Sequence, residues 1–208
     1  MSDKSVESVF TYEELMVTVD LPAAVCQEIS AASAALQKAT NPLQMDMFWI
    51  KPTLAHVTLL YTARVRSDLF DTIRDVVAGV CAEVEPFSVR ANGLRLNEEA
   101  RPNDESVVRG VWVMLEPVEP LLDLRVKLQK ALSELDIDVD YLDFVPHIPI
   151  ALTEKFQATR EFQSVIAEWH DRSFGEVAVK ALLLKKTIPN QANVEMPFSV
   201  VANVQLSH

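Results

Sequence analysis

The sequence has few cysteines, few basic residues and no long apolar run, and each shortage excludes a class of protein. Only Cys26 and Cys81 are present among the 208 residues. Both fall in segments that predict helices, and neither belongs to a Cys/His pattern with the spacing of zinc ligands. We therefore expect two buried free thiols and no zinc site.

The apolar stretches fall well short of the roughly 18 residues that a membrane-spanning helix needs. The segment Met1–Glu7 also lacks the basic start and the apolar run of a secretory signal. These two absences predict a cytoplasmic protein with no membrane partner.

Basic residues are outnumbered: the chain has 19 Lys and Arg against 30 Asp and Glu, and a formal net charge of −11. An acidic surface opposes binding to long double-stranded nucleic acid, because such binding depends on neutralising many phosphates with Lys and Arg. The charge balance leaves open a small anionic ligand held in one locally basic cleft.

A chain of this length can bury a substantial core, and its apolar patterns predict both strands and helices. The predicted strands are Leu15–Val19, Phe48–Ile50, Ala55–Thr62, Phe87–Leu96, Val107–Leu115, Pro146–Thr153, Phe174–Lys185 and Phe198–Val204. The predicted helices begin at Pro22, at Ser67–Asp68, after Pro120 and at Thr159. The predicted exposed loops are Asn97–Ser106, Asp136–Asp143 and Lys186–Glu195.

Two of the four histidines begin short apolar segments with the same pattern, Ala55–Thr62 (AHVTLLYT) and Pro146–Thr153 (PHIPIALT). Side chains two apart on a strand point to the same face. His56 and Thr58 therefore share one face of the first strand, and the apolar residues that alternate with them lie on the other. Because the pattern occurs twice, we interpret His56 and His147 as parts of one shared functional site.

The order of elements also repeats along the chain. Each histidine strand is followed by a helix and then by a strand entered at a phenylalanine, Phe87 in the first half and Phe174 in the second. We expect an α+β fold of two similar lobes, each an antiparallel-rich sheet with flanking helices, around a central cleft. In this interpretation residues 1–208 form a single bilobal domain, with residues 1–14 as a candidate flexible leader.

Two imidazoles on opposite walls of a cleft can act on one phosphodiester as base and acid, because the pKa of imidazole lies near neutral pH. One takes the proton of the attacking hydroxyl or water, and the other protonates the departing ribose oxygen. A hydroxyl two residues after a histidine can donate a hydrogen bond to a non-bridging phosphate oxygen. This chemistry needs no metal and no cofactor, and we expect neither.

Paired strands of the pattern H-h-[S/T]-h, in two lobes, resemble the 2H phosphoesterase superfamily. This superfamily includes the LigT-like RNA 2′,3′-cyclic phosphodiesterases and phage enzymes that degrade cyclic-oligonucleotide immune signals. The similarity covers most of the chain, since the lead-in Phe144–His147 (FVPH) and the strand entered at Phe87 fall where the family places them. The resemblance implies that His56 and His147 are the acid/base pair and that Thr58 binds the phosphate.

The chain departs from the family at Pro149, where the resemblance implies Thr or Ser. Proline supplies neither a hydroxyl nor an N–H, and it suits a sheet edge or a bulge better than a central strand. Thr153 is a candidate stand-in hydroxyl further along the same strand. Pro149 thus leaves three alternatives: a slow enzyme, an enzyme with a rearranged phosphate site, or a binding protein.

Further substrate-binding candidates lie near the first motif. Lys51 and Arg64 flank it and can supply positive potential for a phosphate, and Tyr61 can stack on a base. Lys185 and Lys186, late in the chain, can also supply positive potential. Each of these charges is explained equally well as a solvated surface residue.

The first functional hypothesis is a metal-independent phosphodiesterase acting on a small nucleotide or an RNA end. The scissile group is a 2′,3′-cyclic phosphate, a 2′–5′ linkage or the ring of a cyclic oligonucleotide. The alternative is a non-catalytic nucleotide-binding protein, a sponge or a sensor, on the same fold. A third reading is a structural or interaction protein that inherited the fold.

Overall fold

The computed structural model describes residues 11–41, 47–100, 106–139, 144–156, 159–188 and 198–207. The strands in these residues are β1 (Tyr12–Asp20), β2 (Phe48–Trp49), β3 (His56–Arg66), β4 (Phe87–Ala100), β5 (Ser106–Glu116), β6 (His147–Phe156), β7 (Ser173–Val179), β8 (Ala181–Thr187) and β9 (Phe198–Gln205). The α-helices are α1 (Ala23–Thr40), α2 (Phe70–Cys81), α3 (Glu119–Ser133) and α4 (Arg160–Ala167).

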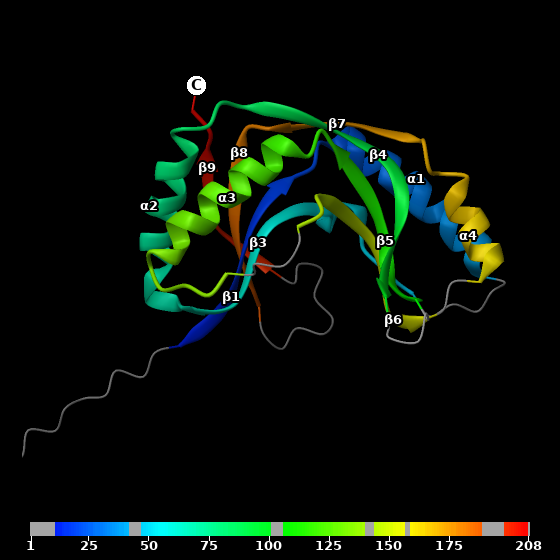
Figure 1. Ribbon diagram of the computed structural model, residues 1–208, viewed down its shortest axis with the longest axis horizontal. Coiled ribbons are helices and arrows are strands. Elements are labelled where there is room, and N and C mark those ends of the chain that lie inside the picture. Colours follow the sequence, from blue (N-terminus) through cyan, green and yellow to red (C-terminus); the bar gives the residue numbers. More distant parts are fainter. Residues whose placement is uncertain are drawn as a thin grey trace, which may run out of the picture.

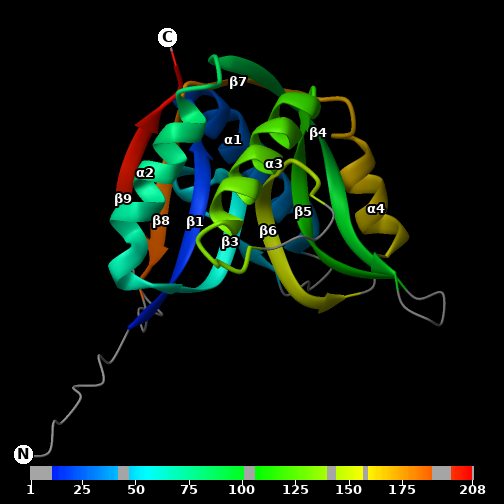
Figure 2. The same cartoon turned by 60° about the vertical axis from the view of Figure 1, so that its left-hand side comes forward.

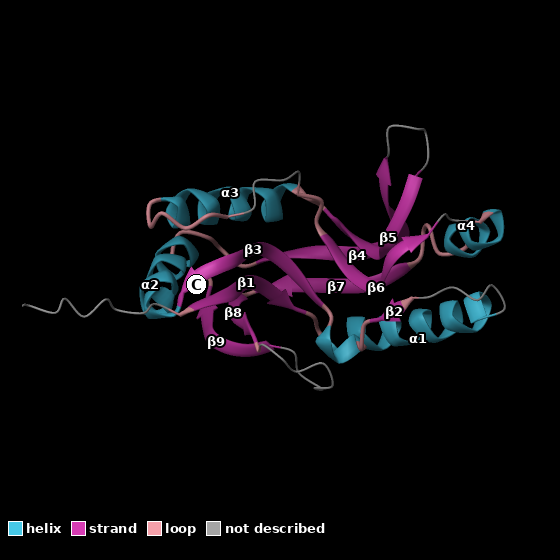
Figure 3. Cartoon of the chain, turned by 90° about the horizontal axis from the view of Figure 1, so that it is seen from below, coloured by secondary structure: helices cyan, strands magenta, loops and turns pink. Residues whose placement is uncertain are grey.

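The strands form two antiparallel sheets (Figure 1). One has four strands in the order β3-β1-β8-β9, and the other has five in the order β2-β6-β5-β4-β7. Helices α2 and α3 pack against the four-stranded sheet, and α1 and α4 pack against the five-stranded sheet (Figure 3). Each sheet thus carries one histidine strand and two helices, which confirms the predicted α+β fold with two similar lobes.

Apolar side chains at helical spacing hold the helices against the sheets. In α1 these side chains are fully buried, and they are Val25, Ile29, Ala32 and Leu36. In α3 the buried apolar set is Leu121, Leu124, Leu128 and Leu132. Burying a Leu or Ile side chain contributes on the order of 1.5–3 kcal/mol, so each of these faces makes a large contribution to the stability of its lobe.

The segment predicted as one strand, Phe174–Lys185, is two strands. Strand β7 lies at the edge of the five-stranded sheet and β8 lies inside the four-stranded sheet, with a break at Lys180. The segment is rich in Val and Leu on both sides of Lys180, and strand pattern alone does not tell one strand with an exposed lysine from two strands that meet at it. The two strands join the lobes covalently.

Several predicted boundaries are wrong. Strand β1 already begins at Tyr12, inside the expected leader. Strand β4 continues to Ala100 and β5 begins at Ser106, so part of the predicted loop is an extended hairpin, while residues 101–105 lie outside the described part. Strand β8 likewise extends to Thr187, and most of the loop predicted after it, residues 189–195, lies outside the described part.

Two local predictions also fail for physical reasons. Ser67 and Asp68 belong to a short 3₁₀ turn, and α2 begins at Phe70 without a side-chain cap. The Asp68 carboxylate instead accepts from the Arg66 guanidinium, with an Nη2–Oδ2 distance of 2.6 Å. In the acidic segment after α3, Ile137 is buried rather than exposed, and residues 140–143 lie outside the described part.

Both cysteines are free thiols in helices, as predicted. Cys26 is partly buried and Cys81 is fully buried. Burial raises the pKa of the Cys81 thiol to about 11, so this thiol stays protonated and unreactive at neutral pH. In the described residues no helix has the length and apolar character to cross a membrane.

Candidate functional site

The two histidine strands place their histidines in matching positions. On β3, His56 and Thr58 are partly exposed while Val57 is buried between them. On β6, His147 and Pro149 are partly exposed on either side of a buried isoleucine. The alternation predicted from the sequence is therefore present in both strands, and Pro149 occupies the position that Thr58 has in the first.

Each histidine ring is anchored in the same way. Nδ1 of His56 lies 2.8 Å from the carbonyl oxygen of Leu54, and Nδ1 of His147 lies 2.7 Å from that of Val145. A carbonyl oxygen only accepts, so Nδ1 carries the hydrogen in both rings. In the neutral rings Nε2 therefore holds the lone pair, and it is the nitrogen through which each ring can exchange a proton.

Each strand also has a β-bulge three residues beyond its histidine. Leu59 is skipped in the pairing of β3 with β1, and Ile150 is skipped in the pairing of β6 with β5. A bulge adds one residue to one strand, bends it and reverses its alternation. At the second bulge a Cβ on Gly110 would lie 2.4 Å from the Ala151 carbonyl oxygen, so only glycine allows β5 to approach there.

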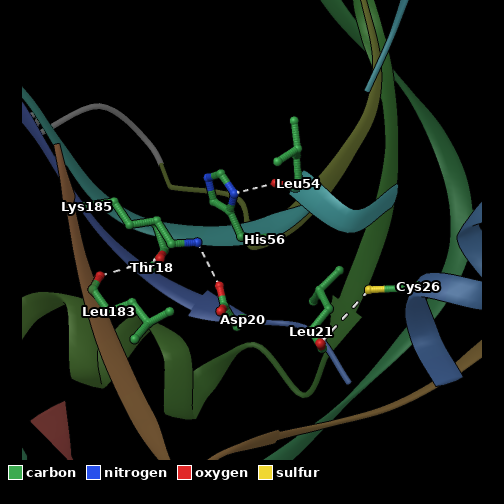
Figure 4. Close-up of polar contacts among 8 residues, drawn as sticks. All are labelled: Thr18, Asp20, Leu21, Cys26, Leu54, His56, Leu183 and Lys185. Carbon is green, nitrogen blue, oxygen red and sulfur yellow. Dashed lines mark hydrogen bonds and ion pairs between the residues drawn. The ribbon is translucent and has the colours of Figure 1, made fainter. Parts of the chain in front are cut away.

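A compact set of charged and aromatic groups surrounds His56. Lys185 is only 4% exposed, and its ammonium lies 2.7 Å from a carboxylate oxygen of Asp20, the residue paired with His56 across β1 and β3. Figure 4 shows the Lys185 ammonium beside the His56 ring and close to the Asp20 carboxylate. The Phe198 ring contacts both neighbours, edge-on to His56 at 5.3 Å between centroids and 4.8 Å from Lys185 Nζ.

These surroundings favour the neutral form of His56. Burial lowers the pKa of the imidazole, and the Lys185 ammonium lowers it further. The hydrogen bond to Leu54 and the Asp20 carboxylate act in the opposite direction and raise the pKa, but they do not cancel the first two effects.

His147 has an aromatic neighbour instead of a charged one. Its ring stacks on Trp112 of strand β5, with 3.7 Å between centroids and an interplanar angle of 19°. Burial lowers the pKa of this imidazole too, and the hydrogen bond to Val145 opposes that shift. The stack also fixes the ring plane, because a flat contact of this kind permits little rotation.

The two histidine strands belong to different sheets, yet they lie side by side (Figure 2). Strand β3 is the edge of the four-stranded sheet, and it packs against β6 near the edge of the five-stranded sheet. One surface pocket is lined by residues of α2 and α3 and does not include either histidine. A shared cleft between the histidines stays a prediction.

The structure separates two of the predicted substrate-binding residues from the histidines. Thr153 follows the bulge, and the pairing places its neighbour Leu152, not Thr153, on the face of Pro149. Thr153 therefore lies on the opposite face of β6 from Pro149. Arg64 lies at the far end of β3, about 26 Å along the strand from His56. The central carbon of its guanidinium lies 4.2 Å from the centre of the Tyr12 ring, at the end of the strand away from His56.

Tyr61 and Lys51 remain candidates. Register places Tyr61 on the face of His56 and Thr58, about 16 Å along the strand. Its hydroxyl donates a hydrogen bond to the Glu14 carboxylate. Burial raises the pKa of the phenol, and the Glu14 carboxylate raises it further. Lys51 is exposed and precedes the 3₁₀ turn Pro52–Leu54 that leads into His56.

Sequence reasoning missed the partners that complete the site. Asp20 and Lys185 lie 165 positions apart, and Trp112 lies on a strand that shares no motif with His147. Lys185 is identified from the sequence only as one of several scattered charges. The one available signal was the position of Lys185 next to a run of leucines, because a lysine buried among them needs a partner of opposite charge.

No group of three or more His, Cys, Asp or Glu side chains in the described ranges is placed to hold a metal ion. The remaining described histidine, His170, is exposed and pairs with its neighbour Asp171. His208 lies outside the described residues.

Two antiparallel sheets, each with a histidine strand that has the same anchor and the same bulge, define a two-histidine class of α+β protein. Residues 49–186 match the 2′-5′ RNA ligase superfamily. The chain belongs to this superfamily, that of the 2H phosphoesterases, which confirms the resemblance seen in the sequence and supports a phosphoesterase-type function. A search of curated proteins by sequence finds no match.

Solved structures share the fold over nearly the whole chain. The protein TT0787 of Thermus thermophilus has a TM-score of 0.68 and 22% identity, covering 93% of this chain and 97% of that one. E. coli LigT complexed with 3′-AMP has a TM-score of 0.66 and 16% identity, covering 95% and 100%. A structure described as a phosphoesterase has a TM-score of 0.62 and 14% identity, covering 94% and 99%. At such identities the likeness establishes the fold alone.

Proposed function

We propose that this protein is a metal-independent phosphodiesterase that hydrolyses a small nucleotide with a histidine base and a histidine acid. The observation that carries the proposal is the repeated anchor, in which Nδ1 of His56 and of His147 donates to the carbonyl two residues earlier. Both Nε2 atoms are then available for proton transfer. The nucleotide complexes solved for E. coli LigT support a nucleotide substrate.

The different surroundings of the two rings support separate roles in this proposal. His56 is the base, because the Lys185 ammonium disfavours a second positive charge beside it. His147 is the acid, because the face of Trp112 stabilises an imidazolium. Water attacks phosphorus and gives a proton to His56 Nε2, while the P–O bond to the leaving ribose oxygen breaks. His147 Nε2–H protonates that oxygen, and Thr58 donates to a non-bridging oxygen.

The test of this function is a panel of 2′,3′-cyclic nucleotides, 2′–5′-linked dinucleotides and cyclic oligonucleotides, incubated with the protein in excess EDTA. We expect one class to yield a linear product with the chelator present, measured by reversed-phase chromatography. The absence of product from every class, at enzyme concentrations equal to substrate, would exclude the proposal.

A second candidate function is a nucleotide-binding protein that retains its ligand intact. Pro149 favours it, since the ring stands where the first motif has the Thr58 hydroxyl. The two functions separate when a bound nucleotide is released by heat denaturation of the protein. Intact ligand at every protein dose supports binding alone, and a linear product supports catalysis.

Replacing Lys185 by Met is expected to raise the pKa of His56, and replacing Asp20 by Asn is expected to lower it. The ammonium lowers this pKa in the wild type and the carboxylate raises it, so removing each reverses its effect. The acidic limb of kcat/KM, which reports the base in the free enzyme, should move to higher pH in Lys185→Met and to lower pH in Asp20→Asn.

The direct measurement is an NMR titration of the imidazole signals, which needs no substrate. His147 is the internal control, because neither Lys185 nor Asp20 affects its pKa. A shift of His56 in the same direction in both variants, or an equal shift of His147, would contradict the assignment of Lys185 and Asp20 as opposed charges at His56.

A further inference from the structure

The carbonyl oxygen of the bulged residue has a different hydrogen-bond donor in each histidine strand. In β6 the carbonyl of the bulged residue, Ile150, accepts from the N–H of Ile50, 3.0 Å away, just past the neighbouring strand β2. Strand β3 is the edge of its sheet, so among the described residues no further strand of that sheet pairs with it at the bulged residue Leu59. A carbonyl left unpaired in such a buried place would cost free energy.

A side chain from helix α3 supplies the missing donor. Nη1 of Arg125 donates to the Leu59 carbonyl oxygen at 2.5 Å. Arg125 is 7% exposed, although it is an arginine on a helix with an exposed face. Buried guanidinium groups are rare unless they are paired, so this position is built for the contact.

The same guanidinium touches the second histidine segment. Its central carbon lies 4.6 Å above the centre of the Phe144 ring. Phe144 is adjacent to Val145, whose carbonyl anchors the His147 ring. One buried side chain thus contacts the bulge that follows His56 and Thr58 and the segment that leads into His147.

We propose that Arg125 is a positioning residue that sets the placement of the two histidine strands relative to each other. The strands belong to different sheets, so no ladder of backbone hydrogen bonds fixes their spacing. Arg125 reaches both and holds the Leu59 carbonyl and the Phe144 ring at a fixed separation. The part of this inference that concerns catalysis rests on the proposed phosphodiesterase function.

The first test compares Arg125→Met, Arg125→Lys and Phe144→Leu by NMR of the imidazole Cε1–H signals, without substrate. We expect Arg125→Met to move the signals of both His56 and His147, and Phe144→Leu to move mainly that of His147. Arg125→Lys keeps a donor for the Leu59 carbonyl but loses the planar stack, so it should restore the His56 signal more than the His147 signal.

The control is Leu132→Ala, which opens a cavity at a buried position two turns further along the same helix. We expect this variant to lower the melting temperature and leave both imidazole signals unchanged. If Arg125→Met does not fold, Arg125→Lys and Phe144→Leu carry the comparison. The inference is wrong if the imidazole signals do not move in Arg125→Met, or, where that variant does not fold, in both Arg125→Lys and Phe144→Leu. It is also wrong if Leu132→Ala moves the imidazole signals as much as those variants do.

The second test uses turnover. A small displacement of the acid relative to the base can cost roughly a hundredfold in rate, so Arg125→Met should lower kcat by about that factor with little change in KM. A wild-type protein without turnover would refute the proposed function, while the imidazole signals would still decide the role of Arg125. A loss confined to KM would contradict positioning of the two histidines.

Discussion

The Pro149→Thr variant is expected to turn over its nucleotide substrate roughly a hundred to a thousand times faster than the wild type. One donor to a developing oxyanion is worth about 2.7–4 kcal/mol of transition-state stabilisation. Thr58 pairs with Thr18 just before the bulge of β3, and Pro149 pairs with Trp112 just before the bulge of β6. A threonine at 149 therefore places its hydroxyl in the same relation to His147 that Thr58 has to His56.

The matched control is Pro149→Val, which has the shape of threonine and the same N–H but no hydroxyl. We expect this variant to stay within a few-fold of the wild type, as measured by kcat on the substrate that the panel identifies. Equal rates for Thr and Val would show that the phosphate site does not lie over residue 149. If the wild type binds without cleaving, the Thr variant should release a linear product.

The histidine strands were predictable because their signal is local. An alternation of partly exposed His and Thr with buried Val is set by the pleat of a strand, and it needs no knowledge of the neighbours. The irregular pairing at Pro149 was also predictable from a local feature of the sequence. Proline disfavours a regular central ladder, and it lies directly before the bulged Ile150, where the pairing is already interrupted.

The partners of the histidines were not predictable, because they arrive from distant elements. A bulge such as that at Leu59 appears in the sequence only as two consecutive apolar residues, which a regular strand also allows. The same kind of bulge in β6 places Leu152 rather than Thr153 on the face of Pro149, and the sequence contains no signal for that change of face. Lys185 was obscured by the unpredicted break between β7 and β8, which moves it into the sheet of His56.

Alanine at His56 or at His147 is expected to lower kcat by about a hundred- to ten-thousandfold, the range that a positioned acid or base contributes. The double variant should be little worse than the poorer single variant, because the two rings act in one proton-transfer step and their effects are not additive. The pH profiles should differ as well. His56→Ala removes the acidic limb of kcat/KM, and His147→Ala removes the basic limb.

The control for these variants is His170→Ala, which removes an exposed imidazole paired only with Asp171 on the surface. We expect it to keep wild-type kcat and melting temperature. Both site histidines are partly exposed and held by single hydrogen bonds to carbonyls, so their alanine variants should also fold. Undiminished turnover in either variant would mean that the ring is not part of the reaction. If His56→Ala or His147→Ala lowered kcat no more than His170→Ala does, the repeated hydrogen bond at Nδ1 would have no role in proton transfer.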